Sequence, residues 1–246
     1  MSHHVESPGD PGSPATTAAI VVAGGEGRRY GGLKQYADLR GRRVLDFSIA
    51  AARSACDRVV LVVPERLTDR DEPAVDAVVA GGATRSESVR AGLAEIPETC
   101  EVIVVHDAVR PLASPALFAQ VIATVRGGAD GAIPGVAVVD TLRRRDGRPL
   151  EVNRDDLVAV QTPQAFDATV LRSVYDDDEA QATDDASLVT AAGGSVVVVP
   201  GERANLKITD AVDLSVADVL AVGPARPELP EPRSVGRLEQ PEGGRS

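Results

Sequence analysis

Aromatic side chains are scarce in this chain, which has no tryptophan and is only 2% aromatic. Since 43% of its 246 residues are nevertheless hydrophobic, its core must be built from Val, Leu, Ile and Ala. No apolar run approaches the length of a membrane span and no signal peptide is visible, so we expect a cytoplasmic protein. The only two cysteines, Cys56 and Cys100, belong to no motif, and we expect both to be reduced thiols in the core.

Positive charge is also scarce, because the formal net charge at pH 7 is −11. This acidic balance argues against nucleic acid or an anionic membrane surface as a partner, and an anionic small substrate would need a local basic pocket. Lysine is rarest of all, since among the 26 basic residues only Lys34 and Lys207 are lysines. Lysine offers a compact point charge where arginine offers a planar fork, so we interpret both lysines as functional.

What the chain does contain is an apolar segment followed by a glycine-rich loop. Residues 18–23 are all apolar and predict a buried strand, and five glycines follow within nine residues. Glycine lets backbone N–H groups approach a ligand closely, and Arg28, Arg29 and Lys34 add positive charge to the same loop. The stretch from residue 17 to residue 35 therefore predicts a polyphosphate site.

Two well-known phosphate-binding patterns do not fit this loop. The Walker pattern requires a lysine directly after its last glycine, but Leu33 follows Gly32. The dinucleotide-binding pattern, counted from Gly25 and Gly27, requires a small residue at position 30, where Tyr30 stands. We therefore predict neither a Walker-type ATPase nor a nicotinamide-dependent enzyme.

Segments of strand and helix character alternate between residues 16 and 222. The expected strands cover residues 18–23, 58–63, 77–80, 102–105, 129–138, 158–161 and 195–199. The expected helices cover residues 44–55, 85–96, a segment that begins at Pro115, and residues 167–175, 183–192 and 210–220. This alternation predicts an α/β fold, Rossmann-like and doubly wound, with a mostly parallel sheet.

Both ends and one internal segment differ in composition from the rest. Residues 1–15 and the proline-rich residues 223–246 lack apolar periodicity, and we predict a disordered N-terminal arm and a disordered tail. Residues 139–153 are too polar for the core, and Asp146-Gly147 is typical of a tight turn, so we predict a projecting β-hairpin arm. A lone hairpin is marginal in water, and we expect this arm to serve dimerisation.

Polar residues follow almost every predicted strand. In doubly wound sheets, ligands bind at the carboxyl ends of the strands, so these residues should converge on one edge. They are the glycine loop, Gly81-Gly82, His106 to Arg110, Asp140-Thr141, Thr162 to Gln164 and residues 201–207.

Several of these residues have more than one reading. Asp107 could bind a metal, a ribose hydroxyl or a substrate hydroxyl, or it could cap a helix. His106 fits a packing role better than that of a base. Thr183, Asp184 and Asp185 could cap the next helix or line the site.

Taken together, the motifs resemble those of a known enzyme superfamily. The segment from Ala23 to Arg29 with Lys34-Gln35, and Gly81-Gly82 followed by Arg85 and Ser88, are similar to the sugar-nucleotide pyrophosphorylase-like nucleotidyltransferases. Later motifs narrow the resemblance to the 2-C-methyl-D-erythritol 4-phosphate cytidylyltransferase family of non-mevalonate isoprenoid synthesis. These are His106 to Pro111, Asp140-Thr141, Gln161 to Gln164, Thr183 to Asp185, and Asn205-x-Lys207.

This resemblance implies a single nucleotidyltransferase domain over residues 16–222 and a role for each site residue. Three catalytic cations would lie against the phosphates: Arg29, Lys34 and Lys207. The nucleotide would be held by Ala23, Gly24, Gly25, Gly27, Gly81, Gly82, Arg85, Ser88 and Asp107. The sugar phosphate would be held by Arg110, Thr141, Arg154 and Thr183.

The same resemblance implies the reaction and its partners. CTP and 2-C-methyl-D-erythritol 4-phosphate would give 4-CDP-2-C-methyl-D-erythritol and pyrophosphate, with Mg²⁺ held mainly by the CTP phosphates and Asp107 as a possible ligand. The enzyme would be a homodimer whose arm reaches the partner's active site. Ribitol 5-phosphate cytidylyltransferases share most of these motifs and are the alternative. From another class, a catalytically inactive nucleotide-binding regulator would share the loop but release no pyrophosphate.

Overall fold

The computed structural model describes residues 16–25, 27, 30–72, 74–148, 152–176 and 184–221, so both predicted terminal arms lie outside the described residues. The strands of the main sheet are β1 (Thr17–Val22), β4 (Arg58–Val63), β5 (Ala77–Ala80), β6 (Val102–Asp107), β7 (Gly131–Ala137), β8 (Val158–Val160), β9 (Gln164–Asp167) and β10 (Val196–Pro200). The α-helices are α1 (Val44–Arg53), α2 (Arg85–Leu93), α3 (Pro115–Arg126), α4 (Ala168–Tyr175), α5 (Asp185–Ala191) and α6 (Ala211–Leu220).

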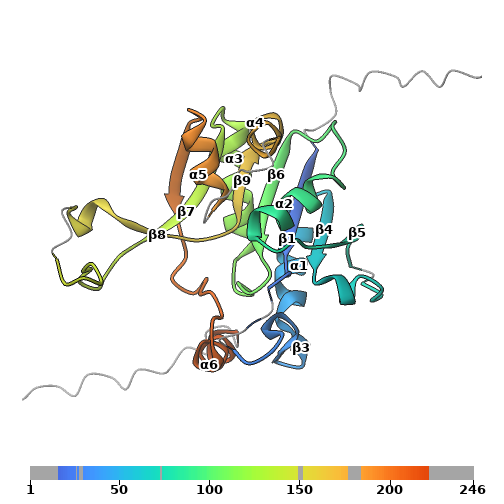
Figure 1. The fold of residues 1–246 in the computed structure, drawn as a ribbon, viewed down its shortest axis with the longest axis horizontal. Helices are drawn as coiled ribbons and strands as arrows, with labels where there is room; N and C mark the ends of the chain where they lie inside the picture. The colour runs from blue at the N-terminus through green and yellow to red at the C-terminus, as the bar shows by residue number, and fades with distance from the viewer. Residues whose placement is uncertain are drawn as a thin grey trace, which may run out of the picture.

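The main sheet has eight strands, and most of its neighbouring pairs are parallel. Its order is β10-β7-β9-β6-β1-β4-β5, with β8 paired to β7 beside this path (Figure 1). β1 lies between β4 and β6 and runs parallel to both, which explains why its sequence is apolar on both faces. The predicted α/β fold with a mostly parallel sheet is therefore confirmed.

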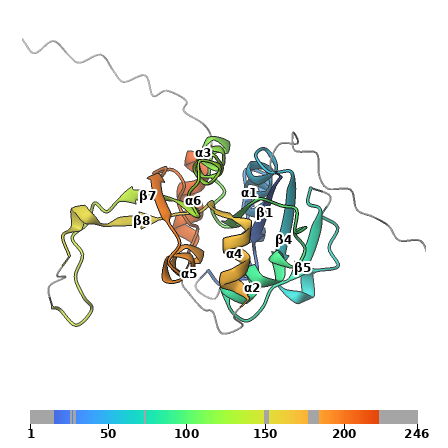
Figure 2. The ribbon, with the colours of Figure 1, turned by 90° about the horizontal axis from the view of Figure 1, so that it is seen from above.

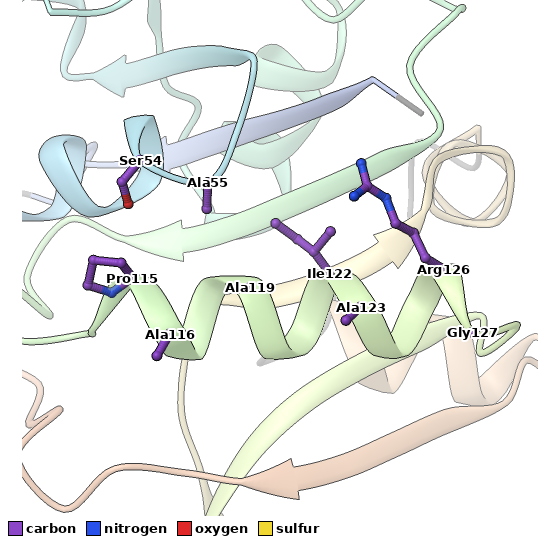
Figure 3. A pocket seen from close by; sticks show the side chains of 9 residues that line it. All are labelled: Ser54, Ala55, Pro115, Ala116, Ala119, Ile122, Ala123, Arg126 and Gly127. Atoms are coloured by element: carbon purple, nitrogen blue, oxygen red, sulfur yellow. The ribbon is translucent and has the colours of Figure 1, made fainter. Parts of the chain in front are cut away.

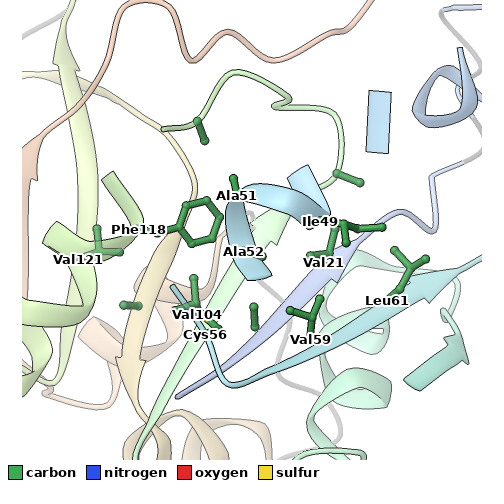
Figure 4. Close-up of a cluster of buried hydrophobic side chains, with 14 of the residues drawn as sticks. Val21, Ile49, Ala51, Ala52, Cys56, Val59, Leu61, Val104, Phe118 and Val121 are labelled. Carbon is green, nitrogen blue, oxygen red and sulfur yellow. The ribbon is translucent and has the colours of Figure 1, made fainter. Parts of the chain in front are cut away.

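Helices cover both faces of the sheet, and the two faces bury separate aliphatic clusters. α1 and α3 lie on one face, and α2, α4 and α5 lie on the other (Figure 2). Alternate residues of β1 enter the two clusters, with Val21 on one side and Ile20 on the other. Phe118 is the only phenylalanine in the α1/α3 cluster, where it packs among small and branched aliphatic side chains (Figure 4). Cys56 and Cys100 are buried and free, as predicted.

One sheet strand was missed because its sequence is short and flanked by polar residues. The predicted strand at 158–161 is present as β8, but the chain then forms a second strand, β9, that runs antiparallel between β6 and β7. Gln164, Ala165 and Phe166 are all buried in β9, so the strand shows no alternation between a buried and an exposed face. So short a segment, with a polar residue at its start, carries too weak a signal to predict a strand.

A two-stranded ribbon, β2 (Asp38–Leu39) with β3 (Arg42–Arg43), was also not predicted. Its turn residues Arg40 and Gly41 both have positive φ, at 57° and 76°, as a tight two-residue hairpin turn requires. The Arg40 side chain pairs with Asp218 of α6, with 3.1 Å between Nε and Oδ1. Helix α6 thereby lies beside the β2/β3 ribbon.

The predicted hairpin at 139–153 differs from the structure in where its strands lie. Antiparallel pairing occurs at the base of the arm, where β7 residues 135–137 face β8 residues 158–160. Beyond that base, the described part of 139–153 contains no strand, and it projects away from the sheet (Figure 1). Its Arg144 and Arg148 pair with Asp146, and these three charged side chains are exposed rather than packed against a facing strand. Within the described residues, no helix has the length and apolar character needed to cross a membrane.

Close packing of α2 on the sheet gives a first testable prediction. A Cβ added at Gly92 would lie 2.6 Å from Ile20 Cγ2, nearer than real carbon contacts allow. Replacing an interior helical glycine by alanine ordinarily stabilises a helix by about 1 kcal/mol. Here we expect Gly92→Ala to lower the melting temperature instead, because overpacking costs about 1–3 kcal/mol. A raised melting temperature would show that α2 has room to shift.

Candidate active site

The glycine loop after β1 is shaped by a buried glutamine. Gln35 lies in a 3-10 helix, Lys34–Tyr36, and its Nε2 donates to the carbonyl oxygens of Ala23 at 2.7 Å and Gly25 at 3.0 Å. Gly27 has a φ of 62°, and a Cβ there would lie 1.8 Å from the Gly32 carbonyl oxygen. The loop therefore needs glycine at position 27. The role of Gln35 went unnoticed in the sequence because an uncharged side chain beside a lysine carries no signal of its own.

A second glycine loop, after β5, forms the opposite wall. The side chain of Thr84 caps α2 by accepting from the Glu87 amide at 3.1 Å, and Glu87 Oε2 accepts from the Ala83 amide at 2.7 Å. A Cβ at Gly81 would lie 2.8 Å from the Ser88 hydroxyl oxygen. The second loop therefore packs closely against α2, because position 81 has no side chain.

Between the loops, at the end of β6, one carboxylate faces three cationic side chains. Asp107 lies 2.7 Å from Lys207 Nζ, 3.6 Å from Arg85 Nε and 3.9 Å from Arg110 Nε, and its side chain is only 10% exposed. Asp107 caps no helix in this position, so its helix-capping reading is wrong. Positively charged side chains therefore gather at this point, in a chain that is strongly acidic as a whole.

Electrostatics at this junction favour the charged forms. Burial by itself would raise the pKa of Asp107, but Lys207, Arg85 and Arg110 outweigh it and lower that pKa to about 2. Burial would lower the pKa of Arg85, yet Asp185 and Asp107 raise it above its ordinary value. The carboxylate and the guanidinium are thus both ionised at neutral pH.

Two pockets meet at this junction. The first, of about 320 Å³, is lined by both glycine loops and both lysines. From the predicted nucleotide set it contains Ala23, Gly24, Gly25, Gly82, Arg85, Ser88 and Asp107. The second, of about 230 Å³, contains Arg110 and shares Arg85, Asp107 and Lys207 with the first. Two anionic ligands bound side by side would therefore meet at these three shared side chains.

Other predicted residues lie elsewhere. Gly27 and Gly81 line an adjoining hollow with Gly24, Gly25 and Gly82. Thr141 and Arg154 are together, but out on the arm, in a hollow of about 230 Å³. Arg154 Nη1 donates to the Val139 carbonyl at 3.1 Å. The structure therefore does not bring this pair to the junction of its own chain, and Arg29 and Thr183 lie outside the described residues.

The loop that carries Lys207 is fastened by the amide of Gln161 and the guanidinium of Arg110. Gln161 Nε2 donates to the carbonyl oxygens of Glu202 at 2.8 Å and Asn205 at 3.1 Å. Arg110 Nη1 also donates to the Asn205 carbonyl, at 2.9 Å. Lys207 is thus presented from a fixed backbone, although its own side chain is about half exposed.

His106 has the packing role expected of it. It is fully buried, its ring meets that of Phe118 edge-on with centroids 5.0 Å apart, and its Nδ1 lies 3.1 Å from the Thr162 hydroxyl. Burial lowers the pKa of His106 to about 4, so the ring is neutral at pH 7.

A larger groove, of about 780 Å³, lies on the outer side of α3 and is not the site. It is lined mainly by small side chains of α3, with Ser54 and Ala55 from the end of α1 (Figure 3). Arg126 is its one ionisable residue, so it lacks the converging polar groups of a catalytic pocket. Among the residues that the structure describes, no three carboxylate, histidine or cysteine side chains are grouped to hold a metal ion.

Comparison with known proteins distinguishes the methylerythritol phosphate cytidylyltransferases from the ribitol 5-phosphate cytidylyltransferases. The model of the family described as "IspD: 2-C-methyl-D-erythritol 4-phosphate cytidylyltransferase" matches residues 17–222. The chain belongs to the IspD family. The motifs quoted from the sequence all lie within the matched region, so the resemblance is confirmed.

IspD relatives resemble the chain in both sequence and structure. The cytidylyltransferase of Rubrobacter xylanophilus is 41% identical, and the match covers 82% of this chain and 93% of that protein. A bifunctional IspD/IspF enzyme of Clavibacter michiganensis is 39% identical over 89% of this chain, but the chain spans only 59% of its length. The crystal structure of the Thermus thermophilus cytidylyltransferase superposes with a TM-score of 0.72 at 30% identity, covering 82% of this chain and 98% of that one.

The buried histidine gives a pH prediction. Because the pKa of His106 falls from 6.5 to about 4 on folding, the unfolded chain binds a proton between these pH values and the folded chain does not. The free energy of unfolding that depends on a neutral His106 is therefore fully present above pH 6.5. It decreases by about 3 kcal/mol as the pH falls from 6.5 to 4. In denaturant titrations at pH 7 and pH 4.5, His106→Gln should lose less stability than the unmutated protein. Equal losses would mean that His106 does not remain neutral in the folded state.

Proposed function

We propose that the protein transfers CMP from CTP to 2-C-methyl-D-erythritol 4-phosphate, releasing pyrophosphate, in non-mevalonate isoprenoid precursor synthesis. The observation that carries the proposal is the junction at Asp107, where Lys207, Arg85 and Arg110 join two anion-sized pockets. Membership of the IspD family favours the methylerythritol phosphate over ribitol 5-phosphate as the acceptor.

The two substrates take different pockets in this proposal. CTP would occupy the larger pocket, with its phosphates along the first glycine loop near Lys34 and its cytidine toward Gly82 and Ser88. The acceptor phosphate would enter the smaller pocket beside Arg110. Arg85 and Lys207 line both pockets, so they would contact the two reacting phosphates at once.

The chemistry needs charge neutralisation more than proton transfer. A phosphate monoester has a second pKa of about 6 and is mostly dianionic at pH 7, so it needs no general base. Its oxygen attacks the α-phosphorus of CTP in line, the new P–O bond forms, and the bond to the β-phosphate breaks to release pyrophosphate. The fixed cations hold two anions together that would otherwise repel each other.

Mg²⁺ would complete this neutralisation. Because the oxygens of Asp107 already face Lys207 and Arg85, the ion would be held mainly by the triphosphate, and Asp107 is the candidate for a protein ligand. Bound there, Mg²⁺ would supply further positive charge to the phosphates of CTP.

We further propose a homodimer with shared active sites. Thr141 and Arg154 lie on the projecting arm, and Arg154 is suited to bind the paired oxygens of a phosphate. The arm and its base expose aliphatic side chains that a second copy would cover. They are Val139, Leu142, Val152, Val158 and Val160, which are between 37% and 63% exposed.

Pyrophosphate release tests the activity directly. The protein should release pyrophosphate from CTP and Mg²⁺ with 2-C-methyl-D-erythritol 4-phosphate, and far more slowly with ribitol 5-phosphate or with other nucleoside triphosphates. Lys34→Ala, with an unchanged melting temperature, should lose roughly 10²–10³ in rate, because one charge that stabilises the transition state is removed. Preference for ribitol 5-phosphate would identify the alternative activity, and no release with any acceptor would indicate a nucleotide-binding regulator.

Mixed dimers test the shared site. Lys34→Ala and Arg154→Ala homodimers should each be nearly inactive, because every site lacks one required cation. A dimer of one Lys34→Ala chain and one Arg154→Ala chain should recover about half of the normal activity, since one of its two sites keeps both residues. Mixed dimers, separated by two different affinity tags, that stay as inactive as the parents would show that Arg154 does not act across the interface.

A further inference from the structure

The guanidinium of Arg85 is held from both sides by carboxylates of different elements. Its Nε faces Asp107 of β6 at 3.6 Å, toward the pockets. On the other side, its Nη2 lies 2.8 Å from Asp185 Oδ2, at the start of α5. Asp185 is fully buried and lines neither pocket, so it cannot touch a substrate itself.

Asp185 is in turn held by α4. The Tyr175 hydroxyl donates to Asp185 Oδ1 at 2.5 Å, and Tyr175 is also buried. Burial and the neighbouring carboxylate raise the pKa of Tyr175, so its hydroxyl keeps the proton that it donates. Arg85, Asp185 and Tyr175 thus form a continuous polar chain from the pocket junction to the outer helix.

Helix capping does not explain this carboxylate. The cap of α5 is the preceding residue, Asp184, whose side chain accepts from the Ser187 amide at 3.1 Å. Both readings of this segment from the sequence, helix cap and site lining, therefore apply to Asp184, which caps α5 and also lines the smaller pocket. Asp185 does neither, and its carboxylate points to Arg85.

We propose that Asp185, fixed by Tyr175, is a positioning residue that holds Arg85 across the junction of the two pockets. The inference rests on the proposed function, because it concerns the geometry of the same site. A long arginine side chain loses much rotamer freedom when it is placed on a ligand. Because Asp185 and Tyr175 already restrict the rotamers of Arg85 in the folded protein, this entropy is lost during folding and not on ligand binding. Arg85 is therefore in place before the phosphates bind.

The effect of Asp185→Asn on catalysis and CTP binding distinguishes a positioning role from a role in folding. Asp185→Asn keeps the shape of the side chain but removes its charge, and a misplaced guanidinium should lower kcat/KM for CTP by roughly 10²-fold. The same variant should weaken CTP binding, measured by calorimetry without acceptor. Tyr175→Phe should shift both quantities in the same direction by less, because Asp185 then keeps its charge.

A double-mutant cycle with Arg85→Ala is the decisive measurement. If Asp185 acts through Arg85, adding Asp185→Asn to Arg85→Ala should change neither kcat/KM nor CTP binding further. For the melting temperature, in contrast, we expect the second substitution to have an effect. Arg85→Ala alone leaves a buried carboxylate without its cation and should lower the melting temperature more than the double variant does.

The control is Asp130→Asn, which loosens the contact between the starts of β7 and β10 without touching the polar chain or the helix that carries Tyr175. Asp130 Oδ2 accepts from the Ser195 amide at 2.7 Å and from the Ser195 hydroxyl at 3.0 Å. It should lower the melting temperature but leave the CTP affinity unchanged. Loss of CTP affinity in this control, or additive effects of Asp185→Asn and Arg85→Ala, would overturn the proposal. CTP binding is measured without turnover, so absence of pyrophosphate release would count against the proposed function alone.

Discussion

The ion pairs of Asp107 are the interaction on which the site depends. A single carboxylate at the end of the central strand β6 gathers Arg110 from its own loop, and Arg85 and Lys207 from two other parts of the chain. Without it, the three cations would repel one another, and two of them, Arg85 and Arg110, are largely shielded from solvent. The carboxylate therefore allows a dense patch of positive charge to exist before any phosphate is bound.

The fold supplies the positions from which these charges converge. β6 and β1 are neighbouring parallel strands, so Asp107 and the first glycine loop leave the same edge of the sheet. Helix α6 packs against Leu39 and Val44 and returns the last part of the described chain to this edge. The Ile208 amide then donates to the Val109 carbonyl at 2.9 Å, one residue beyond Lys207.

The features that could be predicted from the sequence are those whose signal lies in neighbouring residues. The buried parallel strands, the glycine loops and the two lysines all have local signals, and each was identified. Strand β9, the irregular arm and the roles of Gln35 and Asp185 were missed or left open because their causes are tertiary. Arg85 and Asp185 are separated by 100 positions, and nothing in either segment indicates that they pair.

The placement of the lysines has a consequence for chemical labelling. Lys34 and Lys207 are the only lysines of the chain, and both line the larger pocket. An amine-directed reagent therefore finds its only side-chain targets at the proposed nucleotide site, apart from the terminal amine. The extent of acylation would report the occupancy of that site in the unmodified protein, with no engineered probe.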